Sequence, residues 1–165
     1  LSELFEIIAS LAETIGGQRN WKVKHVGADA VLPGALLARL TAVEEATAKN
    51  TGLHVNLAIG YGGRAEIADA VRSIIAEHEA AGGTIDNLAE KLTPKLIGDH
   101  LYTGGLPDPD LVIRTSGEQR LSDFMLWQSA HSEFYFVDAL YPDLRQVDFL
   151  RAMRDFARRE RRYGA

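Results

Sequence analysis

The fold is decided by residues 53–81, LHVNLAIGYGGRAEIADAVRSIIAEHEAA, in which a short apolar run passes directly into a long helical pattern. The run Leu53–Ile59 is short enough for a buried strand and has a glycine on either side. The pattern from Arg64 to Ala81 is typical of a helix, and Gly82-Gly83 ends it. A strand that leads straight into a helix indicates an α/β fold with parallel strands.

The same alternation recurs on both sides of this stretch. Helices are predicted over residues 4–15, from Pro33 toward Asn50, in short pieces between Ile85 and His100, from Ser122 to about Ala130, and over 147–162. Further strands are predicted over 21–26, 111–113 and 133–137. We therefore predict an α/β chain with a parallel central sheet flanked by helices. We expect a single domain over residues 1–165, with ligands bound beyond the carboxyl ends of the strands.

Composition excludes several classes of protein. The 165 residues are 46% hydrophobic, enough to bury one core. No run approaches the roughly 18 apolar residues that cross a bilayer, and the first fifteen residues carry three glutamates, unlike a signal peptide. We therefore expect a soluble chain. The absence of cysteine excludes disulfides and thiolate metal sites.

Charge is distributed unevenly. The net charge is −5, yet residues 151–165 hold six arginines against Asp155 and Glu160. A basic end of this kind suits a nucleic acid, an acidic lipid surface or an anionic ligand, and a solvated helix face is an equally good reading. A nucleic acid is the weakest of these, because the rest of the chain is acidic and contains no recognisable binding module.

The first candidate site is Tyr61-Gly62-Gly63-Arg64, which follows a buried strand and opens a helix. Two glycines let the backbone approach a ligand closely, and a helix N-terminus offers unpaired N–H groups to an anion. A pair of glycines is more often a simple turn, so both readings stay open.

The second candidate is the run 114–122, RTSGEQRLS, which also leaves a strand at its carboxyl end. Arg114, Arg120 and Ser122 supply charge-assisted donors, and arginine can bind a diphosphate through paired hydrogen bonds. The alternatives are solvated arginines or a salt bridge between Arg114 and Glu118. The pattern predicts an anion site about as strongly as it predicts a plain surface loop.

The third candidate is Glu133, which lies between an apolar segment and the aromatic strand Phe134–Phe136. Burying this carboxylate without a partner would be costly, so it should meet an arginine or a cation. Mg²⁺ beside phosphates commonly takes one or two carboxylates, and a structural salt bridge is equally plausible. We set aside two weaker features: the Asp108-Pro109-Asp110 segment, and the five histidines, which show no tight pair of ligands.

Together these motifs resemble a known family. The run Asp110–Ser122, the segment Leu126-Trp127-Gln128 and the pair Ser132-Glu133 resemble the signature of cis-prenyltransferases such as undecaprenyl diphosphate synthases. Residues 61–67, YGGRAEI, resemble a second family motif, and 158–164, RRERRYG, resemble the family's ending. The resemblance covers essentially the whole chain.

The resemblance assigns roles to individual residues. It makes Arg114, Arg120 and Ser122 the cradle for isopentenyl diphosphate, with Glu118 ordering the arginines; Glu118 and Arg120 take the catalytic positions. Glu133 would help to hold Mg²⁺. The remaining assignments are Gly63 and Arg64 at the floor of the substrate site, and Arg162 with Gly164 reaching the site of a neighbouring subunit.

The activity implied is cis elongation of an allylic diphosphate by isopentenyl diphosphate, with release of pyrophosphate. The family is cytoplasmic and homodimeric, makes the lipid carrier for cell-wall synthesis, and could contact a membrane through its lipid product; no nucleic-acid partner is implied. Its Asp-Gly-Asn-Gly-Arg-Trp segment, with the catalytic aspartate, is absent from the printed sequence. We therefore expect a sequence that lacks its N-terminal portion. The alternative is a non-catalytic partner subunit of a heteromeric enzyme.

Overall fold

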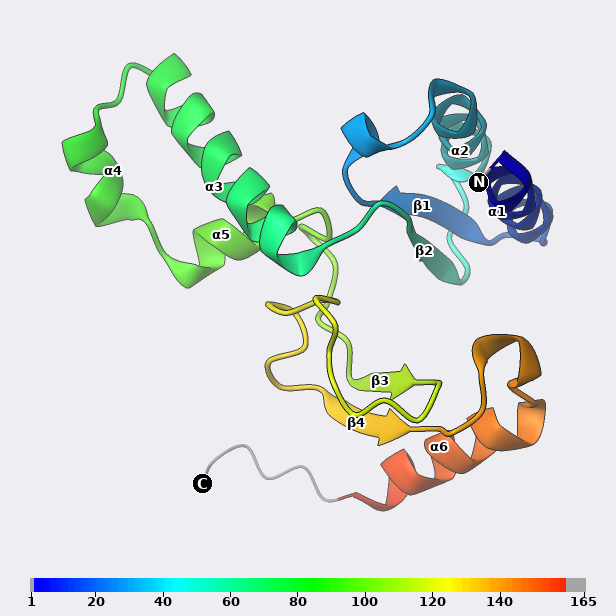
Figure 1. The fold of residues 1–165 in the computed structure, drawn as a ribbon. Helices are drawn as coiled ribbons and strands as arrows, with labels where there is room; N and C mark the ends of the chain where they lie inside the picture. The colour runs from blue at the N-terminus through cyan, green and yellow to red at the C-terminus, as the bar shows by residue number, and fades with distance from the viewer. Residues whose placement is uncertain (1, 160–165) are drawn as a thin grey trace. The chain divides into compact units, whose positions relative to one another are not determined.

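The computed structural model describes residues 2–159, which divide into two compact units; the first ends at Gly104 and the second begins at Gly105. Figure 1 shows the elements of both units. Each unit contains a pair of parallel strands together with helical segments, so the predicted α/β fold class is confirmed. The single-domain organisation stays a prediction.

The first unit is built around strands β1 (Lys22–Val26) and β2 (His54–Ala58). They pair in parallel, with Lys22 opposite His54 and Val26 opposite Ala58. β1 lies within the strand predicted over 21–26 and β2 within the one predicted over 53–59. The connection between them contains the short helical turn η1 (Asp29–Val31) and helix α2 (Gly34–Thr47), which gives the strand–helix–strand order expected for parallel strands.

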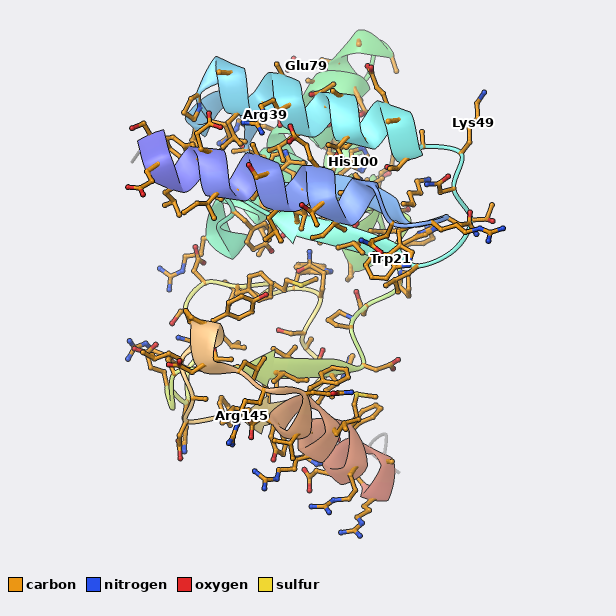
Figure 2. All side chains as sticks on the ribbon, turned by 90° about the vertical axis from the view of Figure 1, so that its right-hand side faces the viewer. Trp21, Arg39, Lys49, Glu79, His100 and Arg145 are labelled. Carbon is orange, nitrogen blue, oxygen red and sulfur yellow. The ribbon has the colours of Figure 1, made fainter. Side chains whose placement is uncertain are left out.

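Helices α1 (Ser2–Gly16) and α2 lie side by side (Figure 2) and form the core of this unit. Ala9 and Ala12 of α1 and Leu36 and Leu40 of α2 are all at most 3% exposed. Small residues on one helix let the larger ones on the other fill the space between them. Arg39, which Figure 2 labels, adds ion pairs from α2 to Glu6 and Glu13 of α1 at 2.7 Å each.

The rest of the first unit is helical, with α3 (Gly63–Ala80), α4 (Ile85–Lys91) and α5 (Pro94–His100). Thr84 and Thr93 cap the two short helices, and Pro94 occupies the first turn of α5, where its missing N–H costs nothing. These are the short helical pieces predicted between Ile85 and His100.

An ion pair joins α5 to α3. His100 Nδ1 lies 2.8 Å from the Leu96 carbonyl oxygen, and Nε2 lies 3.1 Å from Glu77 Oε2. Both ring nitrogens face acceptor oxygens, so the imidazole makes both hydrogen bonds only when both nitrogens carry a proton, which is its charged form. The hydrogen bond to Glu77, then that to Leu96, and the nearby charges of Glu77 and Asp99 raise the pKa of His100 above its usual value.

This pair predicts a pH-dependent contribution to stability. Because the folded-state pKa of His100 is raised, its contribution is complete below about pH 6.5 and is lost as the pH rises through the folded-state pKa. Urea unfolding of the wild type and His100→Gln should therefore show a difference in stability near pH 6 of about 0.5 kcal/mol that fades by about pH 9. An equal difference at both pH values would contradict this role of His100.

The second unit pairs β3 (Leu111–Arg114) with β4 (Glu133–Phe136), again in parallel. The turn η2 (Tyr141–Asp143), which was not predicted, and helix α6 (Gln146–Arg158), predicted over 147–162, follow; residues 160–162 lie outside the described part of the chain. The helix predicted from Ser122 to Ala130 is wrong, since the segment consists of turns. Ser122, Asp123 and Met125 have positive φ angles of 48°, 64° and 46°, which a right-handed helix does not accommodate.

Within residues 2–159, no helix combines the length and the apolar character needed to cross a membrane.

Candidate active site

The loop that leaves β3 brings four of the predicted site residues together. Arg114 is the last residue of β3, and its Nη2 donates a hydrogen bond to Glu118 Oε2. Arg120 Nη2 donates to the other oxygen of that carboxylate at 2.6 Å, and Arg120 Nε donates to Ser122 Oγ at 3.2 Å. Glu118 therefore holds both guanidiniums at once, and the three charges sum to +1.

Backbone geometry fixes the start of this loop. Ser116 and Gly117 have positive φ angles of 72° and 68°, which turn the chain sharply after β3. Their N–H groups donate to the carbonyl oxygens of Ala139 and Val137, at 2.8 and 2.9 Å. The loop is thereby anchored to the chain that continues from β4, and Glu118 follows the turn directly.

A cavity of about 270 Å³ opens beside the loop. Its lining combines the arginines with apolar side chains: Val112, Ile113, Arg114, Thr115, Ser116, Arg120, Leu121, Phe124 and Phe134. Arg114 Nε is buried without a hydrogen-bond partner among the described residues. The guanidiniums of Arg114 and Arg120 are positively charged, so the cavity combines positive charge with apolar walls.

Glu133 lies apart from this loop. It begins β4 opposite Leu111, whereas Arg114 is opposite Phe136, so the two residues occupy opposite ends of the strand pair. Arg159 Nη1 donates to Glu133 Oε2 at 2.7 Å. The sequence predicted an arginine or a cation as the partner of this carboxylate, and the described partner is an arginine.

The glycine motif belongs to the first unit. Gly62 caps α3, Gly63 is buried in its first turn, and Arg64 is exposed. Glu66, which our sequence analysis did not single out, is only 1% exposed and accepts hydrogen bonds from Tyr61 Oη at 2.5 Å and Tyr102 N at 2.9 Å. The sequence feature that could have identified Glu66 is its place in the YGGRAEI motif. This carboxylate ties the start of α3 to the chain after α5.

Two further assignments cannot be placed on the structure. Arg162 and Gly164 lie outside the described residues. Between Ser2 and Arg159, no group of three or more histidine, aspartate or glutamate side chains is arranged to hold a metal ion.

Comparisons with known proteins agree with the motifs. Residues 1–164 match the model of the family described as "Putative undecaprenyl diphosphate synthase". The chain is 55% identical over 164 residues to isoprenyl transferase 1 of Streptomyces avermitilis, covering 99% of this chain and 64% of the relative. It is 52% identical over 166 residues to (2Z,6E)-farnesyl diphosphate synthase of Mycolicibacterium smegmatis, covering 99% and 63%. The chain thus spans less than two thirds of the length of these relatives.

A solved structure resembles the chain as well. It is lavandulyl diphosphate synthase from Lavandula x intermedia, in complex with dimethylallyl diphosphate, with a TM-score of 0.88 and 32% identity. The match covers 98% of this chain and 70% of the plant protein. The chain belongs to the undecaprenyl diphosphate synthase family of prenyltransferases, the cis-prenyltransferases that its Asp110–Glu133 motifs resemble.

Proposed function

We propose that this protein is a cis-type isoprenyl diphosphate synthase, which condenses isopentenyl diphosphate with an allylic diphosphate and releases pyrophosphate. The observation that carries the proposal is a cavity lined by both Arg114 and Arg120, whose guanidiniums are held by the one carboxylate of Glu118. The names of the relatives, an isoprenyl transferase and a (2Z,6E)-farnesyl diphosphate synthase, support the same chemistry.

The loop would bind the diphosphate of isopentenyl diphosphate. Arg114 and Arg120 present guanidinium groups to its oxygens, and the Ser122 hydroxyl adds a donor beside Arg120. Glu118 accepts a hydrogen bond from each arginine, so their positions are set before the ligand arrives. Fixed positive charge of this kind favours a bound diphosphate without reorganisation of the site.

The apolar part of the cavity suits the five-carbon group. Val112, Leu121, Phe124 and Phe134 line it beside the arginines, so one ligand can place a charged end and a hydrocarbon end in the same cavity. Apolar walls also exclude water from the reacting carbons. Gly63 and Arg64 at the start of α3 are proposed to support the substrate site.

Mg²⁺ is the proposed cofactor, with Glu133 as its protein ligand. Glu133 already binds a cation, the Arg159 guanidinium, and a single carboxylate suits Mg²⁺ when phosphate and water complete its shell. The residues therefore fit the ion as one ligand of several. Bound Mg²⁺ would neutralise charge on the departing pyrophosphate.

We further propose a homodimer in which Arg162 of one subunit serves the site of the other, and a peripheral contact with a membrane through the lipid product. The competing proposal is a non-catalytic subunit that supports another chain's site.

An assay separates the two proposals. The purified protein, produced from its complete gene, is incubated with radiolabelled isopentenyl diphosphate, an allylic diphosphate and Mg²⁺. A cis-prenyltransferase should yield a longer labelled prenyl diphosphate without any other protein. A product that forms only when a second prenyltransferase chain is added would support the partner subunit and contradict the enzyme.

A further inference from the structure

One guanidinium joins the start of β4 to the end of α6. Arg159 Nη1 donates to Glu133 Oε2 at 2.7 Å and to the Phe134 carbonyl oxygen at 3.0 Å. Arg159 Nε and Nη2 donate to Asp155 Oδ2 at 3.0 and 2.5 Å. The side chain of Arg159 is 33% exposed and that of Glu133 34%, so solvent reaches the pair only in part.

Arg159 therefore occupies the position of a cation between two carboxylates. Glu133 comes from β4 and Asp155 from α6, and each bonds to the same guanidinium, which leaves the three groups with a net charge of −1. Without the guanidinium the two like charges would repel each other. Glu133 bonds to Nη1 and Asp155 to the edge formed by Nε and Nη2, and a carboxylate such as Glu133 is the kind of oxygen ligand that a hard divalent cation takes.

We propose that Arg159 is a built-in competitor of the divalent cation for Glu133. The inference rests on the proposed role of Glu133 as a metal ligand. It adds that Arg159 controls whether the Glu133 carboxylate is free to bind the metal. When a metal binds Glu133, Arg159 gives up that carboxylate and keeps Asp155 and the Phe134 carbonyl. Metal binding and the contact between β4 and the end of α6 are then coupled, and each weakens the other by the same factor.

The test measures metal binding without any substrate. Mn²⁺, which has an electron paramagnetic resonance signal when free, is titrated into the complete protein, into Arg159→Gln and into Arg154→Gln. Arg154 is an exposed arginine of α6, the helix that Arg159 caps, so its variant loses the same charge without the ion pair. Arg159→Gln should bind Mn²⁺ about tenfold more tightly than the wild type, because it lacks the partly exposed, charged hydrogen bond that competes for Glu133. Arg154→Gln should match the wild type.

A second variant shows where the metal binds. In Arg159→Gln combined with Glu133→Gln, the gain in affinity should disappear. Wild-type or weaker affinity in Arg159→Gln would overturn the proposal, and so would a gain that survives the loss of Glu133. If Arg159→Gln does not fold, Arg159→Lys carries the test: its single ammonium should give an intermediate affinity, and wild-type affinity would overturn the idea. Because no substrate is present, a failed prenyltransferase assay would leave this result unaffected.

Discussion

Arg120→Ala lowers kcat/KM for isopentenyl diphosphate by about 100-fold if the Arg114–Ser122 loop is the diphosphate site. The substitution removes donors to the diphosphate and also the partner that Arg120 provides for Glu118. Hydrogen bonds between charged groups contribute about 1.5 to 3 kcal/mol, which corresponds to the predicted loss. Arg120→Lys keeps the charge but loses the planar fork, so its loss should be intermediate.

The matched control is Arg72→Ala. Arg72 and Arg120 have side chains that are 70% and 68% exposed, and each is paired to one nearby carboxylate. Steady-state kinetics with isopentenyl diphosphate as the varied substrate measure both variants. Equal effects of the two substitutions, or unchanged kinetics in Arg120→Ala, would contradict the assignment of the loop.

Gly27→Ala destabilises the first unit by about 3 kcal/mol, the second large effect that we expect. Gly27 follows β1 with a φ angle of +155°, and a Cβ atom there would lie 2.1 Å from the carbonyl oxygen of Ile59. Any side chain must therefore push apart the ends of β1 and β2, and the backbone conformation adds its own strain. The free energy of unfolding, measured by urea denaturation, gives the size of the loss.

Gly34→Ala is the control for this measurement. Gly34 begins α2, and a Cβ atom at this position would meet nothing within 4 Å. Alanine also has a higher helix propensity than glycine, so the variant should match or slightly exceed the wild type in stability. If both alanine variants unfold at the same urea concentration, the close approach of Gly27 to β2 does not constrain the fold.

The sequence predicted most of the regular elements because their patterns are local. The run Leu53–Ile59 has the length and composition of a buried strand, and β2 lies within it. A helix was wrongly predicted from Ser122 to Ala130. Ser122 is a favourable N-cap residue, but the backbone at Ser122, Asp123 and Met125 has positive φ angles, which end any helix there. Leu121 and Phe124 are not part of a helix, and they line the cavity beside the arginines.

The candidate site could be predicted only where its residues are close in sequence. Arg114, Glu118, Arg120 and Ser122 lie within one loop, and the structure joins them by hydrogen bonds. The partner of Glu133 comes from a different element, 26 residues later, so the sequence indicated the kind of partner but could not identify Arg159. The burial of Glu66 likewise depends on Tyr102, which is 36 residues away.

The most direct measurement is a crystal structure of the protein with isopentenyl diphosphate bound. We predict diphosphate oxygens within about 3 Å of the Arg114 and Arg120 guanidiniums, with the hydrocarbon end against the apolar walls of the cavity. A structure in which isopentenyl diphosphate binds elsewhere and neither arginine contacts it would contradict the account.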